Sequence, residues 1–393
     1  MIAPEQGAVM MFTRRCFGLI AASALLMAPA LAEDGVSDTT ILLGMESPSN
    51  SFSLDEENLG FRLAFQERND RGAIHGRQIA WRDYVRKGGG NVESMMENVR
   101  RLVDTDKVFA LVNFGGPGAI PLAKFARDNK VPYLFPHTAL ISSDNERYLF
   151  TSFPRYEGEA LVMFRYLAQE RGLKRIAMVH DSNVYGTRFL GWLKEHAEKF
   201  GYTFAGNAPV DTREPTDLTA ALEGLAKNAD AVVMALYPAQ AKTLMNAKAK
   251  LDWSGRMVSV GPLTDEQYLT LPEGRANGTL GFCYYPDPDL AKDPGVETYR
   301  QVMAKYHPGR PLNRYSLYGY VFGKLIVEGL ERAGKELTRE RFVDAMETIA
   351  NWDAGGIMPN VTLSRTNHHA QRAGFICELQ DERFKPLSGW IEP

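Results

Sequence analysis

The sequence predicts an α/β protein built from two doubly wound lobes. Short apolar segments alternate with amphipathic helical segments along most of the chain, and after residue 150 the same alternation starts again. Strand–helix alternation of this kind specifies a parallel sheet covered by helices on both faces. At 393 residues, 45% of them hydrophobic, the chain is long and apolar enough for two cores.

The first lobe is expected to begin near residue 38. Its strands are expected at residues 40–44, 78–84, 108–112 and 132–135. A helix over residues 56–69 follows the first strand and ends before Gly72. The helix before the third strand has the clearest period, because apolar side chains recur there every three or four residues, at Val92, Met95, Met96, Val99, Leu102 and Val103.

The second lobe repeats the alternation. Its helices are expected at residues 157–171, 185–199, 217–227 and 239–250, and its strands at residues 175–180, 204–210, 231–236 and 257–260. An extended segment over residues 280–285 then leads to three more helices, near residues 295–307, 315–333 and 339–350. From Gly355 onward we expect loops and short strands, around residues 361–363 and 375–379.

The first 32 residues have the pattern of an export signal. Arg14 and Arg15 precede an apolar run over residues 18–28, and Ala30-Leu31-Ala32 forms an A-x-A cleavage site. The run is shorter than the roughly 20 residues that cross a bilayer. We therefore expect a cleaved signal peptide over residues 1–32 and a periplasmic protein without a lipid or membrane anchor. The paired arginines also fit a twin-arginine signal, and the sequence leaves the export route open.

The composition of the remaining chain gives no sign of a nucleic-acid or anionic-lipid partner. Residues 33–393 carry 43 basic and 47 acidic side chains, a net charge of −4, which provides no basic footprint. Two cysteines remain, Cys283 and Cys377. In an oxidising compartment they form either a disulfide or two buried thiols, and the sequence leaves both open.

Several short segments, spread over nearly all of the mature chain, carry a family resemblance. They are residues 69–77 (NDRGAIHGR), 106–110 (DKVFA), 131–136 (VPYLFP), 174–181 (KRIAMVHD) with Tyr185-Gly186, 230–234 (DAVVM) and Gly319-Tyr320. In this order and spacing they resemble the leucine/isoleucine/valine-type periplasmic binding proteins of ABC transporters. The resemblance implies a monomeric periplasmic receptor that passes a small solute to the permease subunits of an ABC importer.

The resemblance also implies how the chain divides. Two Rossmann-like lobes would be joined by three crossing strands, with the ligand bound between the lobes. The crossings would fall near residues 149–155, 281–286 and 352–359. The N-terminal lobe would comprise residues 33–152 plus 284–352, and the C-terminal lobe residues 153–283 plus 353–393.

A glycine-rich loop is the first candidate for the binding site, since ligands of open parallel sheets lie beyond the carboxyl ends of the strands. The loop Asn113-Phe114-Gly115-Gly116-Pro117-Gly118 follows the third strand and precedes a helix. Glycines let backbone N–H groups approach a ligand, and a helix start offers free donors and a positive dipole end. We expect Phe114, Gly115, Gly116 and Gly118 to bind a carboxylate, although strand-to-helix turns also use glycine for structural reasons alone.

The resemblance adds candidates on both lobes. It places main-chain acceptors and a hydroxyl at Pro136, His137 and Thr138, against the head group of the ligand. We expect His137 to be a hydrogen-bonding loop residue rather than a chemical participant. On the second lobe the resemblance places the rings of Tyr185 and Tyr237 over the ligand, although tyrosines at loop starts also serve as packing residues.

The segment after the strand at residues 257–260 departs from the family pattern. Members that bind α-amino acids usually have a carboxylate on the second lobe for the ligand ammonium, whereas this segment reads Gly261-Pro262-Leu263-Thr264-Asp265. An ammonium buried without an anionic partner costs several kcal/mol. We expect Thr264 and Asp265 at the site, with Asp265 as the partner of an amino acid. A carboxylic acid without an amino group, aromatic in view of the candidate rings, is the other ligand class left open.

An enzyme is the rival class. The sequence contains no G-x-S-x-G, H-E-x-x-H or Walker A motif, and Pro121 stands where a dinucleotide fingerprint from Gly116 needs Gly or Ala. The adjacent His368 and His369 are expected to be solvated in a polar tail. We therefore expect no catalytic residue, metal or cofactor. A sensor that signals by the same lobe closure is a further alternative, which genetic linkage to permease and ATPase subunits would distinguish.

Overall fold

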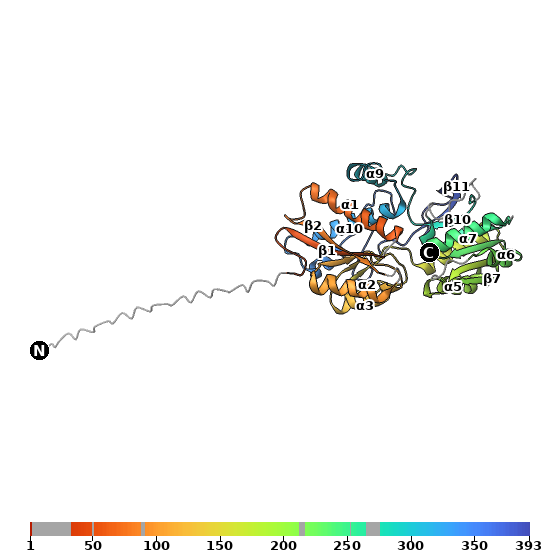
Figure 1. Ribbon diagram of the computed structural model, residues 1–393. Helices are drawn as coiled ribbons and strands as arrows, with labels where there is room; N and C mark the ends of the chain where they lie inside the picture. The colour runs from red at the N-terminus through yellow and green to blue at the C-terminus, as the bar shows by residue number, and fades with distance from the viewer. Residues whose placement is uncertain (2–32, 49–50, 88–90, 212–216, 252, 265–275) are drawn as a thin grey trace. The chain divides into compact units, whose positions relative to one another are not determined.

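Two β-sheets organise residues 33–393 (Figure 1). The computed structural model describes residue 1 and residues 33–48, 51–87, 91–211, 217–251, 253–264 and 276–393. The first sheet has the order β2-β1-β3-β4-β5, with every neighbouring pair parallel. The second has the order β12-β11-β10-β9-β8-β6-β7. Only the pairs β10–β11 and β11–β12 are antiparallel in it. The predicted α/β class is confirmed.

Helices cover both faces of the first sheet. Its strands are β1 Thr40–Pro48, β2 Gln78–Arg86, β3 Ala110–Val112, β4 Tyr133–Leu134 and β5 Leu149–Phe150. Along β3, Ala110 and Val112 join the buried cluster of α1 (Phe52–Asp70) and α10 (Arg314–Ala333). Leu111 joins the cluster of α2 (Val92–Arg100) and α3 (Ala119–Asp128). Because side chains alternate across a strand, the two helix pairs lie on opposite faces.

Glycines hold α1 and α10 at backbone contact. A Cβ on Gly60 would lie 2.1 Å from the carbonyl oxygen of Ser316, and one on Gly319 would lie 2.0 Å from the carbonyl oxygen of Glu57. Only glycine permits such an approach. This contact fixes the first two turns of α1, where Glu57 lies, against α10.

The second sheet is formed by the middle and the end of the chain. Its strands are β6 Arg175–Asp181, β7 Thr203–Val210, β8 Ala231–Ala235, β9 Arg256–Ser259, β10 Leu280–Cys283, β11 Phe375–Gln380 and β12 Arg383–Pro386. The remaining helices are α4 Tyr156–Arg165, α5 Val184–Phe200, α6 Thr219–Ala226, α7 Pro238–Lys250, α9 Pro294–Tyr306 and α11 Arg339–Met346. The lobe boundaries given above stay a prediction.

The structure differs from the sequence-based expectation mainly at the ends of elements. α1 begins at Phe52, one turn before residue 56, and the helices expected to reach residues 103 and 171 end in π-helical turns, Arg101–Thr105 and Tyr166–Glu170. β4 has only two residues, because Phe135 takes a left-handed φ of 51° and leaves the strand. None of the described helices is long and apolar enough to span a membrane.

Candidate functional site

The glycine-rich loop lies at the carboxyl end of β3, as predicted. A 3-10 turn over Gly116–Gly118 runs directly into α3, and the first N–H groups of such a helix have no intrahelical partner. Gly116 has a φ of +72°, and a Cβ on it would meet nothing within 4 Å. The backbone of Gly116 therefore faces open space, as a ligand-binding turn requires.

Two other residues of this loop, Phe114 and Gly118, have structural roles. The Phe114 ring is buried at a centroid distance of 6.4 Å from Tyr133, whose hydroxyl donates to the Phe114 carbonyl oxygen at 2.7 Å. A Cβ on Gly118 would lie 2.5 Å from Cε of Met95. Side-chain contact with a ligand is therefore not available to Phe114, and Gly118 is needed for the packing of α2 on the loop.

His137 lies beside this loop and pairs with a buried carboxylate. A Cβ on Gly115 would lie 2.8 Å from Cβ of His137. Nδ1 of His137 lies 2.6 Å from Oε1 of Glu57, a fully buried side chain, while the imidazole is 19% exposed. Burial raises the pKa of the Glu57 carboxyl, and the neighbouring His137 opposes that shift. The pair brings a polarised imidazole next to the free N–H groups of the turn.

The neighbours of His137 are less available. Pro136 is buried, and its carbonyl oxygen accepts from the Thr138 N–H at 2.8 Å. Thr138 is 2% exposed, and its hydroxyl accepts from the Leu140 N–H at 3.1 Å. Their hydrogen bonds shape the loop after β4 so that the side chain of His137 stays partly exposed.

Tyr185 and Tyr237 come together on the second sheet. Their ring centroids lie 5.7 Å apart, and Tyr156 lies 5.4 Å from Tyr185. Asn183, the N-cap of α5, donates from Nδ2 to the Tyr237 hydroxyl at 3.1 Å. Its backbone N–H donates to Oδ1 of Asp181 at 2.9 Å. The two predicted tyrosines thus belong to one aromatic group at the carboxyl end of β6.

The segment after β9 is anchored by a carboxylate that the sequence interpretation missed. Glu159, fully buried on α4, accepts from the Gly261 N–H at 2.7 Å and from the Tyr284 hydroxyl. Burial raises the pKa of Glu159 to about 8. The sequence-based expectation placed a carboxylate only in the loop after β9, whereas Glu159 lies on a helix about a hundred residues earlier in the chain.

Thr264 lies in that segment, and Asp265 lies outside the described residues. Thr264 is 5% exposed, and its hydroxyl donates to the Gly261 carbonyl oxygen at 2.7 Å. Its own carbonyl oxygen accepts from buried Arg314 at 3.5 Å. The same guanidinium donates to the carbonyl oxygens of Tyr285 and Phe384, each at 3.2 Å. Arg314 therefore joins the backbone at Thr264 to the backbone at Tyr285 and Phe384, and this junction holds Thr264 in place.

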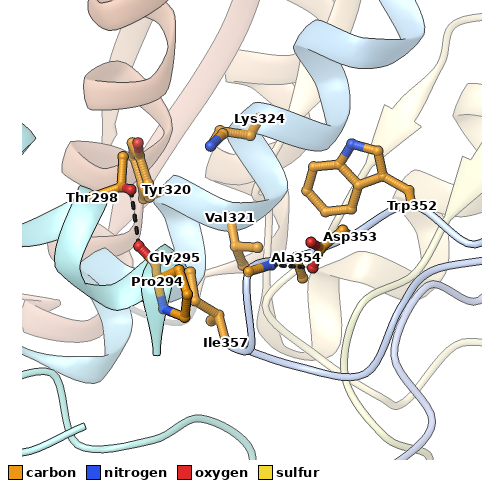
Figure 2. Close-up of a pocket in the computed structure, with 11 residues that line it drawn as sticks. Pro294, Gly295, Thr298, Tyr320, Val321, Lys324, Trp352, Asp353, Ala354 and Ile357 are labelled. Carbon is orange, nitrogen blue, oxygen red and sulfur yellow. Dashed lines mark hydrogen bonds between the residues drawn. The ribbon is translucent and has the colours of Figure 1, made fainter. Parts of the chain in front are cut away.

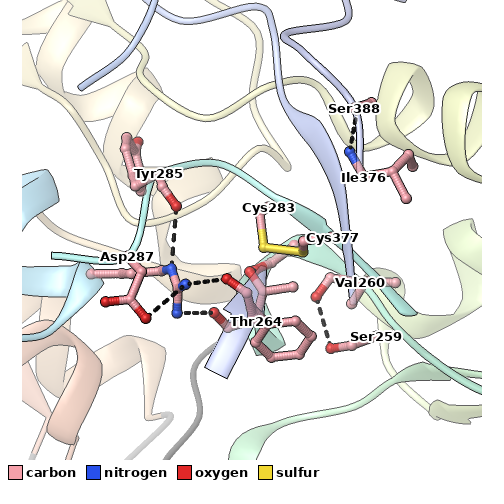
Figure 3. The surroundings of a disulfide bond; sticks show 12 residues. Ser259, Val260, Thr264, Cys283, Tyr285, Asp287, Ile376, Cys377 and Ser388 are labelled. Carbon is pink, nitrogen blue, oxygen red and sulfur yellow. Dashed lines mark hydrogen bonds and ion pairs between the residues drawn. A yellow bond between two sulfur atoms is a disulfide. The ribbon is translucent and has the colours of Figure 1, made fainter. Parts of the chain in front are cut away.

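Cys283 and Cys377 are joined in a disulfide close to this junction (Figure 3). The bond links β10 to β11, which pair antiparallel. Of the two states that the sequence left open, the structure contains the disulfide. It closes a loop with a sequence separation of 94 residues.

The two groups of candidate residues adjoin one another. The Tyr315 ring of α10 lies 6.2 Å from the His137 ring, and the Tyr315 hydroxyl donates to the Pro262 carbonyl oxygen at 2.9 Å. Phe153 lies 5.3 Å from His137 and 5.2 Å from Tyr284, measured between ring centroids. The loop after β4 and the turn after β9 are thus neighbours in the folded chain.

Four buried polar atoms near these residues have no hydrogen-bond partner within the described part of the protein. They are Oε2 of Glu57, Oδ1 of Asn113, Oδ2 of Asp181 and the Tyr185 hydroxyl. An unsatisfied buried polar group costs about 1–3 kcal/mol, so native proteins rarely leave one without a partner. Such a concentration is typical of a site that a polar ligand or bound water completes.

The two adjacent histidines differ from the expectation that they would be solvated. His368 is 3% exposed and stacks on Phe150 at 4.2 Å. His369 is 6% exposed, and its Nε2 lies 2.6 Å from the Phe153 carbonyl oxygen. Burial lowers the pKa of His369 to about 4. The chain returns here to pair with residues 151–153, which explains the burial. Among the described residues no group of three or more His, Cys, Asp or Glu could hold a metal ion.

Two sheets of mainly parallel strands, with the candidate residues near their carboxyl ends, characterise a two-sheet α/β protein. The chain matches the family model described as periplasmic binding protein over residues 41–383. It therefore belongs to the periplasmic binding protein family, and its fold is that of type I members. The resemblance stated from the sequence is confirmed.

Solved structures show the same fold at low sequence identity. A fatty acid ABC transporter substrate-binding protein from Thermomonospora curvata has a TM-score of 0.80 and 21% identity, covering 92% of this chain and 94% of that chain. A possible leucine/isoleucine/valine-binding protein from Rhodopirellula baltica has 0.79 and 19%, covering 91% and 98%. A branched chain amino acid ABC transporter protein from Thermus thermophilus with bound valine has 0.77 and 16%, covering 91% and 98%. No curated protein matches the sequence.

Proposed function

We propose that the protein is an exported receptor that binds a small organic solute through a carboxylate and delivers it to the permease of an ABC importer. Family membership supports the receptor role, and several similar structures are named as ABC transporter substrate-binding proteins. The proposal includes a signal peptide over residues 1–32. It also includes the two lobes given above, 33–152 plus 284–352 and 153–283 plus 353–393, whose closure would enclose the solute.

The proposal of a carboxylate ligand rests on the corner formed by the Gly115–Gly116 turn and His137. The turn offers backbone N–H donors and the positive end of α3. Nδ1 of His137 hydrogen-bonds Oε1 of Glu57, which orients the partly exposed imidazole beside the turn. The corner therefore suits an anion, which the N–H groups of the turn and the His137 ring would bind together.

The opposite side of the site would hold the body of the solute. Tyr185 and Tyr237 offer ring surface, and the Tyr185 hydroxyl and Oδ2 of Asp181 offer polar atoms without partners in the described protein. An acceptor such as Asp181 favours a ligand with a donor at this end, such as an α-amino group. An aromatic carboxylic acid without an amino group would use the ring surface alone.

A thermal-unfolding panel of amino acids, aliphatic acids and aromatic acids tests the proposal. A ligand at 100 times its Kd stabilises the protein by about 2.7 kcal/mol. We expect at least one carboxylate to raise Tm, and His137→Gln to weaken its binding about tenfold or more, since a charge-assisted hydrogen bond contributes about 1.5–3 kcal/mol. His75→Gln is the control, because His75 is exposed and hydrogen-bonds the Glu331 carbonyl oxygen in the last turn of α10.

The pattern within the panel decides the ligand class. A shift with amino acids, lost in Asp181→Asn, assigns Asp181 to the ligand ammonium. A shift with acids that lack an amino group, unchanged in Asp181→Asn, assigns the carboxylic-acid class. No shift with any carboxylate, or equal binding by the His137→Gln protein, would overturn the proposed anion corner.

A further inference from the structure

A separate cavity lies among α9, α10 and the segment over residues 352–357 (Figure 2). Its volume is about 220 Å³, and none of the residues discussed above as solute-binding candidates lines it. Pockets for drug-sized molecules have volumes of roughly 300–1,000 Å³. This cavity therefore suits a smaller molecule, of about the size of an amino acid.

One wall of the cavity is a turn with a closely packed backbone. Gly355 has a φ of +66°, and a Cβ on it would lie 2.7 Å from Cα of Gly295. The Gly295 N–H donates to the Gly355 carbonyl oxygen at 2.7 Å. The Gly355 N–H in turn donates to Oδ1 of Asp353, also at 2.7 Å. The Gly355 N–H thus orients the carboxyl group of Asp353.

Two side chains of opposite charge line the cavity without neutralising each other. Lys324 comes from α10, and its ammonium lies 5.5 Å from the centroid of the Tyr320 ring. Neither Lys324 nor Asp353 forms an ion pair with any charged side chain that the structure describes, although both face the same space. A molecule that carries both charges would satisfy both groups at once.

Much of the remaining lining is apolar. Val321, Ala354 and Ile357 are buried, and Trp352 is half-buried beside them. Figure 2 shows these side chains around the cavity together with Lys324 and Asp353. A hydrocarbon side chain in contact with them would leave water, and the burial of its apolar surface would favour binding.

We propose that this cavity is a second binding site, for a small zwitterion with an apolar side chain. The ligand carboxylate would lie against Lys324, the ligand ammonium against Asp353, and the side chain against Trp352 and Val321. The site is independent of the proposed solute site. Because both charged groups are partly or wholly exposed, binding is weak, with a Kd of about 0.1–1 mM.

The test uses the indole N–H signal of Trp352 in protein labelled with 15N-tryptophan. The chain has five tryptophans, and Trp352→Phe assigns the signal. The mature protein is titrated with L-leucine, 4-methylpentanoate and 3-methylbutylamine. Each ligand is added up to about 10 mM, a range that covers weak binding. The last two lack the amino group and the carboxyl group of leucine, respectively.

We expect leucine to shift the Trp352 signal and both single-charge analogues to shift it at least about fivefold more weakly. Lys324→Met and Asp353→Asn should each weaken the leucine response by a similar factor, and the amide oxygen introduced by Asp353→Asn would still accept from the Gly355 N–H. Tyr185→Ala should leave the response unchanged, which separates this site from the solute site. An absent shift, an equal response to 4-methylpentanoate, or a response unchanged in Asp353→Asn would each overturn the proposal.

Discussion

Replacement of Tyr185 by Phe should have opposite effects on folding stability and on ligand affinity. The Tyr185 ring is 5% exposed and packs against Tyr156, Phe189 and Tyr237 at centroid distances of 5.4, 5.5 and 5.7 Å. Its hydroxyl is buried and has no partner in the described protein. The substitution keeps the ring contacts and removes only that hydroxyl.

The expected size follows from the state of the hydroxyl. A buried hydroxyl without a partner costs about 1–3 kcal/mol, part of which a bound water recovers in the free protein. The free energy of unfolding of ligand-free Tyr185→Phe should therefore be unchanged or higher by up to about 1 kcal/mol. If the hydroxyl accepts a hydrogen bond from the ligand ammonium, the affinity should fall about tenfold, since a hydrogen bond to a charged group contributes about 1.5–3 kcal/mol.

Tyr202→Phe is the matched control. Tyr202 is also buried, at 6% exposure, but its hydroxyl donates to the Leu193 carbonyl oxygen on α5. Its removal should lower the free energy of unfolding by about 1 kcal/mol and leave the affinity unchanged. Urea unfolding of both variants without ligand, and calorimetric titration with the solute found in the panel, give the two quantities. Loss of stability in Tyr185→Phe equal to that in Tyr202→Phe, with unchanged affinity, would refute the placement of this hydroxyl at the site.

Two further predictions concern the second sheet. Because burial raises the pKa of Glu159 from 4.5 to about 8, the folded protein holds a proton that the unfolded chain loses between those values. The contribution of this group to the free energy of unfolding therefore falls as pH rises from about 5 to 8. Glu159→Gln should become progressively more stable relative to the native protein over that interval, by at most about 5 kcal/mol at pH 9. Urea midpoints measured from pH 5 to pH 9 check this, and a stability difference that does not change with pH would contradict it. The Cys283–Cys377 disulfide closes a loop with a separation of 94 residues, so the Cys283→Ser, Cys377→Ser double variant should be less stable by about 2–5 kcal/mol. If the double variant unfolds at the same temperature as the native protein under non-reducing conditions, the thiols are not joined in the purified protein.

The order of strands and helices could be predicted from the sequence because each element carries its own period. The helix containing Met95 and Val99 shows this, since its apolar side chains recur with the helical repeat and these two are fully buried against the first sheet. Ends of elements were predicted less well. The π-helical turn at Arg101–Thr105 and the early start of α1 at Phe52 depend on tertiary packing, which the local pattern does not encode.

Most candidate residues predicted from the sequence follow strands, and their binding roles stay predictions, whereas two buried carboxylates on helices were missed. Gly115, after β3, and His137, after β4, lie in contact. Glu57 lies in the second turn of α1 and Glu159 in the first turn of α4, among polar residues that a helical pattern assigns to solvent. One signal was available for Glu57, because the glycines at 60 and 319 indicate a close helix contact that buries this face of α1.

The charges on the two sides of the proposed site suggest how a solute would be recognised. On the first sheet, Oε1 of Glu57 is already engaged with His137, so an incoming carboxylate meets the imidazole edge instead of that carboxyl oxygen. On the second sheet, both oxygens of Glu159 accept hydrogen bonds, which leaves Asp181 as the buried carboxylate with an oxygen to spare. A solute that bridges the two sides would therefore place its acid group on His137 and its donor on Asp181. Binding should then require both ends, because each end alone leaves a buried polar atom on the other side without a partner.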